Sequence, residues 1–129
     1  MNSAWAALSE GAELPPLPVA VSEAANDRYW AGAGIDPSAR PPGVLFPPMA
    51  ANLTILAVQQ AVGEPLLHTA QRLRSHRSLP APADLVVRAR CVRRFDKRGR
   101  DYAVVEAEVE GPDGRPLWTS VATFTPVRP

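Results

Sequence analysis

The chain has 129 residues, with 14 basic and 13 acidic side chains and a formal net charge of +1. This length fits one domain around a single core, and the near-zero net charge provides no long-range field for nucleic acid or an anionic membrane. The single cysteine, Cys91, excludes an internal disulfide and a zinc site built on several thiolates. No apolar run approaches the roughly 20 residues that span a bilayer, and residues 1–9 do not resemble a signal peptide. We therefore expect a cytoplasmic protein without a metal ion.

Residues 1–17 predict an extended N-terminal arm, because the proline-rich run Leu14-Pro15-Pro16-Leu17-Pro18 disfavours regular structure. One domain is expected over residues 18–129. It begins with a short helix, for which Ser22 is a suitable N-cap and after which Gly32 and Gly34 favour an end. Residues 36–43 contain three prolines and predict an irregular loop.

The segment Pro48–Val62 is the strongest helix prediction in the chain. Apolar side chains lie around nearly its whole circumference, and only Asn52, Thr54, Gln59 and Gln60 interrupt them. Proline is tolerated in a first helical turn and Gly63 is a suitable end. Because a helix that is apolar on all sides must be buried, we expect the rest of the domain to wrap it.

From Leu66 onward, the hydrophobic period changes to two, which predicts strands. Alternation is clear in residues 85–92, 102–110 and 117–127, and a less regular strand is expected over residues 66–77. Pro112-Asp113-Gly114 is typical of a turn between the last two strands. The predicted architecture is α+β: an antiparallel meander of about four strands around one central helix.

The arginines of the first predicted hairpin favour a neutralised surface over nucleic-acid binding. A three-residue loop from Arg98 to Arg100 would place Arg90 opposite Glu108 and Arg88 opposite Glu110. Such cross-strand pairs contribute roughly 0.2–1 kcal/mol each and cancel the local field. The remaining positive charge lies at the turn, where it is available to an acidic partner.

Other candidate functional groups are few. His68 and His76 are an even number of residues apart, so we expect both on one strand face, as surface residues more than as a metal pair or a general base. Cys91 is expected in the core. Asp36 lies in the loop before the central helix, where catalytic groups are common, although an Asp-Pro turn fits the local sequence slightly better.

A long central helix followed by antiparallel strands resembles the hotdog fold. The stretch from Tyr29 to Met49, which contains Tyr-Trp-Ala-Gly-Ala-Gly-Ile-Asp and then Phe-Pro-Pro-Met, resembles MaoC-like proteins and, more closely, their "FAS1-like" N-terminal dehydratase domain. The resemblance covers residues 18–127. It implies an acyl thioester of coenzyme A or acyl carrier protein as substrate, in fatty acid or polyketide metabolism, with hydration of an enoyl group or dehydration of a 3-hydroxyacyl group. It implies no further cofactor.

The chain departs from the pattern of active family members at two positions. Those members use an Asp and, five residues later, a His to activate water; Asp36 matches the first, but Pro41 stands at the second and residues 36–49 contain no His. They also use a glycine N–H at the start of the central helix to polarise the thioester carbonyl. Pro48 stands there in this chain and has no N–H to donate.

We therefore expect the substrate-binding, catalytically degenerate half of a hydratase or dehydratase, which forms a homodimer or pairs with a catalytic MaoC-type hotdog partner. The candidate residues lining the acyl site, which are equally explained as core, are Phe46, Met49, Asn52, Leu53 and Leu56. One alternative is a self-sufficient dehydratase that uses Asp36 with Arg40. Another is a hotdog thioesterase, which the lack of a carboxylate between Met49 and Gly63 disfavours. A third is a non-catalytic acyl-binding or assembly module.

Overall fold

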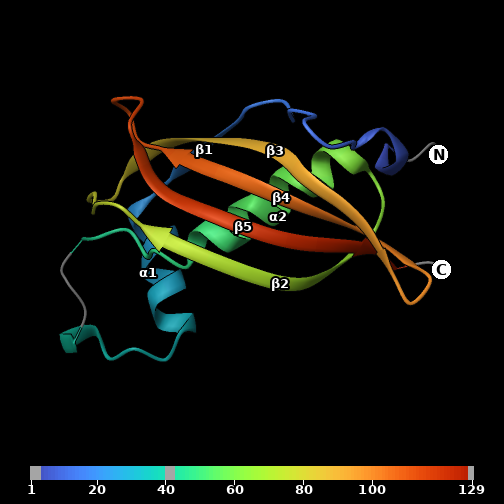
Figure 1. Cartoon of the computed structure of the whole chain (residues 1–129). Coiled ribbons are helices and arrows are strands. Elements are labelled where there is room, and N and C mark those ends of the chain that lie inside the picture. Colours follow the sequence, from blue (N-terminus) through green and yellow to red (C-terminus); the bar gives the residue numbers. More distant parts are fainter. Residues whose placement is uncertain (1–3, 40–42, 128–129) are drawn as a thin grey trace.

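The computed structural model describes residues 4–39 and 43–127 and consists of one antiparallel sheet with a long helix against one face (Figure 1). The helices are α1 (Glu23–Gly32) and α2 (Met49–Val62), and single 3₁₀ turns form at η1 (Trp5–Ala7) and η2 (Pro37–Ala39). The strands are β1 (Leu17–Val21), β2 (Leu66–Ser75), β3 (Ala83–Lys97), β4 (Arg100–Glu110) and β5 (Pro116–Pro126). The predicted α+β arrangement of a sheet around a central helix is confirmed.

The strand order is β1-β3-β4-β5-β2, which differs from a simple meander. Strands β3, β4 and β5 follow one another as predicted, but β2 pairs with β5 and not with its chain neighbour β3. The connection over residues 76–82 contains two prolines and is too long for a tight hairpin. Strand β1 was not predicted, because prolines dominate its surroundings; Pro18 is tolerated because β1 lies at the edge of the sheet.

The β3–β4 register differs by two residues from the expected one. Arg88 lies opposite Glu108 and Arg90 opposite Glu106, because the turn contains two residues instead of three and a bulge after Cys91 adds one residue to β3. A shift of two residues keeps every side chain on its predicted face. Charge neutralisation is therefore retained: Arg88 contacts Glu110 at 2.9 Å and Arg90 contacts Glu106 at 3.5 Å.

Helix α2 begins and ends where the sequence predicts. Its Gly63 has a φ of +76°, and the N–H of that glycine donates to the carbonyl of Gln59. One side packs on the sheet, with Ala50 and Val58 fully buried. The opposite side stays exposed along a stripe at helical spacing: Asn52, Leu56, Gln59 and Gln60. The expected wrapping is therefore present on one side of α2 only.

The N-terminal segment, residues 4–16, packs against the domain over much of its length. The amide of Ala4 donates to the carbonyl of Val62 at the end of α2, and that of Leu14 donates to Ala89 in β3. Trp5 and Leu8 are 6% and 4% exposed and belong to the hydrophobic core. The sequence predicted an extended arm here, whereas residues 5–7 form a helical turn from which Trp5 enters the core.

Candidate functional site

The N-terminus of α2 is fixed by hydrogen bonds from α1. Asn26 is 2% exposed; its side-chain amide donates to the carbonyl of Val44 at 2.8 Å, and its Oδ1 accepts from the N–H of Phe46 at 2.9 Å. The indole N–H of Trp30 also donates to the carbonyl of Val44 at 2.8 Å. Because a buried amide must satisfy both its donor and its acceptor, Asn26 determines the path of the chain into α2.

Three aromatic rings meet at this position: Tyr29, Trp30 and Phe46, here called the aromatic cluster. The Phe46 ring stacks on Tyr29 with centroids 6.1 Å apart and meets Trp30 edge-on at 5.0 Å. Tyr29 and Phe46 remain half-exposed. The cluster therefore places an apolar, partly open surface beside the start of α2.

The first backbone amides of α2 have partners within the same turn. Pro47 and Pro48 have no N–H. The next three amides, from Met49 to Ala51, donate to the carbonyls three residues earlier at 3.1 Å each. A helix N-terminus usually has free N–H groups that can bind an anion or an oxyanion. In α2 none of these first three amides is available to polarise a thioester carbonyl.

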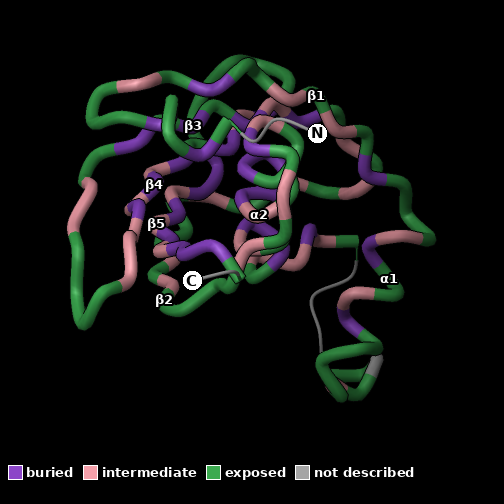
Figure 2. Tube along the Cα trace, turned by 90° about the vertical axis from the view of Figure 1, so that its right-hand side faces the viewer, coloured by how far each residue is buried: buried purple, intermediate pink, exposed green. Residues whose placement is uncertain are grey.

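Asp36 forms a local turn. Its Oδ1 accepts hydrogen bonds from the backbone N–H of Ser38 at 2.9 Å and from the Ser38 hydroxyl at 2.8 Å, an Asx turn. These two bonds hold the pKa of the exposed Asp36 carboxyl below its usual range. Segment η2 lies to one side of α2 and the sheet (Figure 1, Figure 2). A carboxylate with a low pKa in water is a weak general base. Arg40, its expected helper, and Pro41 lie outside the described residues.

The predicted acyl-lining residues of α2 lie along one face of the helix, at spacings of three and four residues, but they differ in exposure. Met49 and Leu53 are 1% and 5% exposed and belong to the core packed against the sheet. Asn52 and Leu56 lie on the exposed stripe, where Leu56 is 40% exposed, and Phe46 is in the aromatic cluster. These residues therefore lie where the buried face of α2 meets its exposed stripe, and their role in lining an acyl site stays a prediction.

The two histidines do not share a face, contrary to the prediction. A bulge between His68 and Ala70 reverses the alternation of β2. His68 stacks on the ring of Phe124 at 5.4 Å on the α2 side, whereas Nε2 of His76 lies 2.6 Å from the hydroxyl of Thr119 on the other side. Both are exposed, as expected. In the described part of the chain, no three His, Cys, Asp or Glu side chains are grouped to hold a metal, and no helix is long and apolar enough to cross a membrane.

Cys91 is buried, as the sequence predicts. Burial raises the pKa of its thiol, and the thiol donates a hydrogen bond to the carbonyl of Arg93. A thiol in this state is a poor nucleophile. Cys91 is therefore a core residue.

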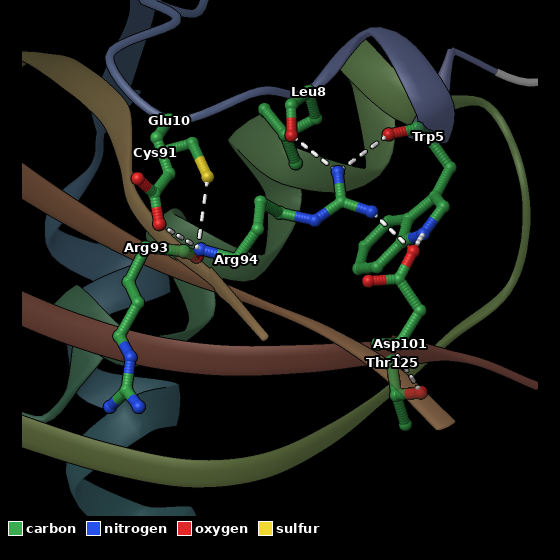
Figure 3. Close-up of polar contacts among 8 residues, drawn as sticks. All are labelled: Trp5, Leu8, Glu10, Cys91, Arg93, Arg94, Asp101 and Thr125. Carbon is green, nitrogen blue, oxygen red and sulfur yellow. Dashed lines mark hydrogen bonds and ion pairs between the residues drawn. The ribbon is translucent and has the colours of Figure 1, made fainter. Parts of the chain in front are cut away.

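A polar cluster around Arg94 was not predicted (Figure 3). Its guanidinium lies over the Trp5 ring, 4.5 Å from the centroid, and donates to the carbonyls of Trp5 and Leu8 and to the carboxylate of Asp101. The Trp5 indole N–H donates to the same carboxylate at 2.9 Å. Trp5 and Arg94 are 89 residues apart, so no local pattern indicates the contact. The cluster attaches the N-terminal segment to the β3–β4 hairpin.

No family model and no curated protein matches this chain, but solved structures share its fold. The HadBC (3R-hydroxyacyl-ACP dehydratase) complex of Mycobacterium tuberculosis matches with a TM-score of 0.75 at 15% identity, over 90% of this chain and 96% of the other. The R-hydratase PhaJ1 of Pseudomonas aeruginosa matches with a TM-score of 0.74 at 16% identity, over 94% of this chain and 83% of the other. The ChsH1-ChsH2 complex of Mycobacterium tuberculosis matches with a TM-score of 0.75 at 12% identity, over 92% of this chain and 98% of the other. The chain therefore has the hotdog fold of MaoC-like hydratases and dehydratases.

Proposed function

We propose that this chain is the substrate-binding, catalytically degenerate half of a two-hotdog hydratase or dehydratase that acts on acyl thioesters. The observation that carries the proposal is the closed N-terminus of α2. Two prolines and three internally bonded amides leave no donor for the thioester oxygen at this position. Loss of a single oxyanion donor typically costs 10²–10³ in rate.

The surroundings of Asp36 support the same proposal. Its carboxylate is exposed and bonded to Ser38, and residues 36–39 and 43–49 place no histidine beside it. Hydration needs a base that holds water against the bound enoyl group. That base is therefore expected from a second subunit with an intact Asp/His pair.

Two surfaces support association with another hotdog chain. Strand β2 is ten residues long and forms one edge of the sheet, and among the described residues only β5 pairs with it. A long unpaired edge is a template for another strand. The exposed stripe of α2 lies on the side of that helix that the sheet leaves open, with Leu56 at its centre. HadBC and ChsH1-ChsH2, which share the fold, are complexes of two named proteins.

Reconstitution tests this function. The purified chain, a MaoC-type hotdog protein with the Asp/His pair from the same genome, and their mixture are assayed for hydration of crotonyl-coenzyme A and of longer enoyl thioesters. We expect no turnover by the chain alone, and faster turnover or acceptance of longer acyl groups by the mixture than by the partner alone.

The variant Asp36→Asn separates this proposal from a self-sufficient enzyme, with Asp84→Asn, another exposed carboxylate, as its matched control. We expect both variants to support the mixture equally. If the isolated chain hydrates crotonyl-coenzyme A and only Asp36→Asn abolishes that activity, the chain is an enzyme in its own right.

A further inference from the structure

The basic residues of the β3–β4 hairpin form two groups. Three arginines have an acidic partner: Arg88 with Glu110, Arg90 with Glu106 and Arg94 with Asp101. The other four cations, which lie within residues 93–100, form no ion pair with a described residue. These four, here called the hairpin surface, are Arg93, Lys97, Arg98 and Arg100. Residues 93–101 contain two acids, Asp96 and Asp101, and Asp101 is paired with Arg94. The four cations of the hairpin surface therefore face a single further acid, Asp96, and the surface is positive.

Part of the hairpin surface is held in place by aromatic stacking. The guanidinium of Arg93 lies over the Phe95 ring, 4.7 Å from its centroid, and Phe95 stacks on Tyr102 at 4.9 Å. Arg100 donates to the carbonyl of Pro126 at 3.3 Å. Because these side chains are already ordered, binding costs them less conformational entropy than it costs free side chains.

The turn itself does not require an arginine. Arg98 and Gly99 form the two-residue turn, with φ of +53° and +77°. Asn, Asp and Gly are favoured where φ is positive in such turns, and Arg98 is the one described residue other than glycine with a positive φ. The fold therefore favours another residue here, and the positive charge has to be explained by something other than the turn.

The place of the hairpin surface follows from the sheet. Leu66, the first residue of β2, pairs with Pro126, whose carbonyl accepts from Arg100 beside the hairpin turn. Ser75 pairs with Trp118 at the other end of β2, and α2 begins at that end of the sheet (Figure 1). A two-fold axis that joins two β2 edges makes them antiparallel. In the proposed two-hotdog unit, the hairpin surface of this chain then lies at the end where the partner's central helix begins.

We propose that the hairpin surface docks an acidic acyl carrier protein, which delivers its thioester to the catalytic partner. This inference rests on the proposed function, since it places the carrier where the partner's site begins. Complementary charge is expected to act mainly on the association rate and to weaken with salt. The partner class is an acidic protein surface; free coenzyme A carries the same acyl arm without that surface.

The test measures affinity of the full chain in complex with its hotdog partner for a crotonyl-loaded acyl carrier protein, for the unloaded carrier and for crotonyl-coenzyme A. The variant is Lys97→Gln with Arg98→Asn. The control is Arg88→Gln with Arg90→Gln, which removes the same charge from the paired region of the same strand. We expect the hairpin variant to weaken both carrier forms about tenfold and to leave crotonyl-coenzyme A unchanged, while the control changes carrier binding less than twofold.

Folding is checked by thermal unfolding, where Arg98→Asn is expected to be at least as stable as the parent because Asn tolerates positive φ. Equal weakening by the two double variants, or none by either, overturns the proposal. The proposal is also overturned if a DNA duplex displaces the carrier when the concentration of DNA phosphates equals that of carrier carboxylates, because the surface would then bind polyanions in general. If crotonyl-coenzyme A does not bind the unmodified complex, the proposed function is contradicted. If the hairpin variant still binds the unloaded carrier about tenfold more weakly than the parent in that case, the docking surface is supported.

Discussion

The guanidinium of Arg94 lies 4.5 Å from the centre of the Trp5 ring, across 89 residues of sequence. The same guanidinium bonds two carbonyls of the N-terminal segment and the Asp101 carboxylate, so one side chain joins three parts of the chain. Trp5 and Leu8 are thereby kept over the end of the core next to the last turn of α2. This cluster therefore adds to the backbone hydrogen bonds of Ala4 and Leu14 in attaching the N-terminal segment to the domain.

Substituting Arg94 by Ala is expected to lower the free energy of unfolding by about 2–3 kcal/mol. The loss follows because two carbonyls and a carboxylate lose a charged donor that is only 20% exposed. Urea denaturation measures the change, and limited proteolysis at residues 4–16 shows whether that segment detaches. Arg93→Ala is the control, because Arg93 is exposed and a change at such a position is usually within about 0.5 kcal/mol. Equal effects of the two substitutions would contradict the role assigned to Arg94.

Asn26→Asp tests the attachment of α1 to the start of α2. The substitution keeps the shape and the acceptor for Phe46 but replaces the donor to the Val44 carbonyl by a carboxylate oxygen. We expect a loss of about 2–3 kcal/mol in thermal or urea unfolding, since the site is buried. Arg28→Ala, an exposed change on the same helix, is expected to have little effect. A stable Asn26→Asp protein would mean that the hydrogen bonds of Asn26 do not fix the chain there.

The turn between β4 and β5 gives a pH-dependent prediction. Asp113 accepts from the backbone N–H of Arg115 at 3.1 Å and from the Arg77 guanidinium at 2.6 Å, and these bonds hold the pKa of its carboxyl below the usual range. A lowered pKa in the folded state adds stability above the unfolded value, and that stability is lost as pH falls through the folded value. The stability difference between the parent and Asp113→Asn is therefore expected to be complete at pH 7, to begin to fall below about pH 4 and to vanish only below the lowered pKa of the folded state. A difference that persists unchanged at pH 2 would exclude ionisation as its cause.

The sequence predicted those elements whose signals are local. Helix α2 has an apolar pattern and a stop at Gly63, and α1 has the N-cap Ser22, whose hydroxyl accepts from the N–H of Ala25 at 3.1 Å. Burial of Cys91 followed from alternation in β3. Each of these features depends on residues within a few positions of one another.

Features set by single-residue insertions or by distant contacts were not predictable in the same way. One extra residue in β3 shifted the register opposite Glu108, and another in β2 moved His68 and His76 to opposite faces. The site at the start of α2 depends on Asn26, whose buried hydrogen bonds reach 18 and 20 residues along the chain. A buried Asn in an otherwise amphipathic helix is a weak signal, because Asn is usually exposed.

The exposed stripe of α2 yields a prediction that separates association from folding. Leu56→Asp places a charge on a side chain that is already 40% exposed in the single chain, so the free energy of unfolding of the monomer is expected to change by less than about 0.5 kcal/mol. If a second hotdog chain covers the stripe, the same charge is buried there without a partner and association weakens at least about tenfold. Val92→Asp is the matched control, because Val92 is 36% exposed on β3, away from both α2 and the β2 edge. Analytical ultracentrifugation, alone and with the catalytic partner, measures the effect. Unchanged association in Leu56→Asp would mean that the partner does not contact this face of α2, and the two-hotdog unit would then have to form through the β2 edge alone.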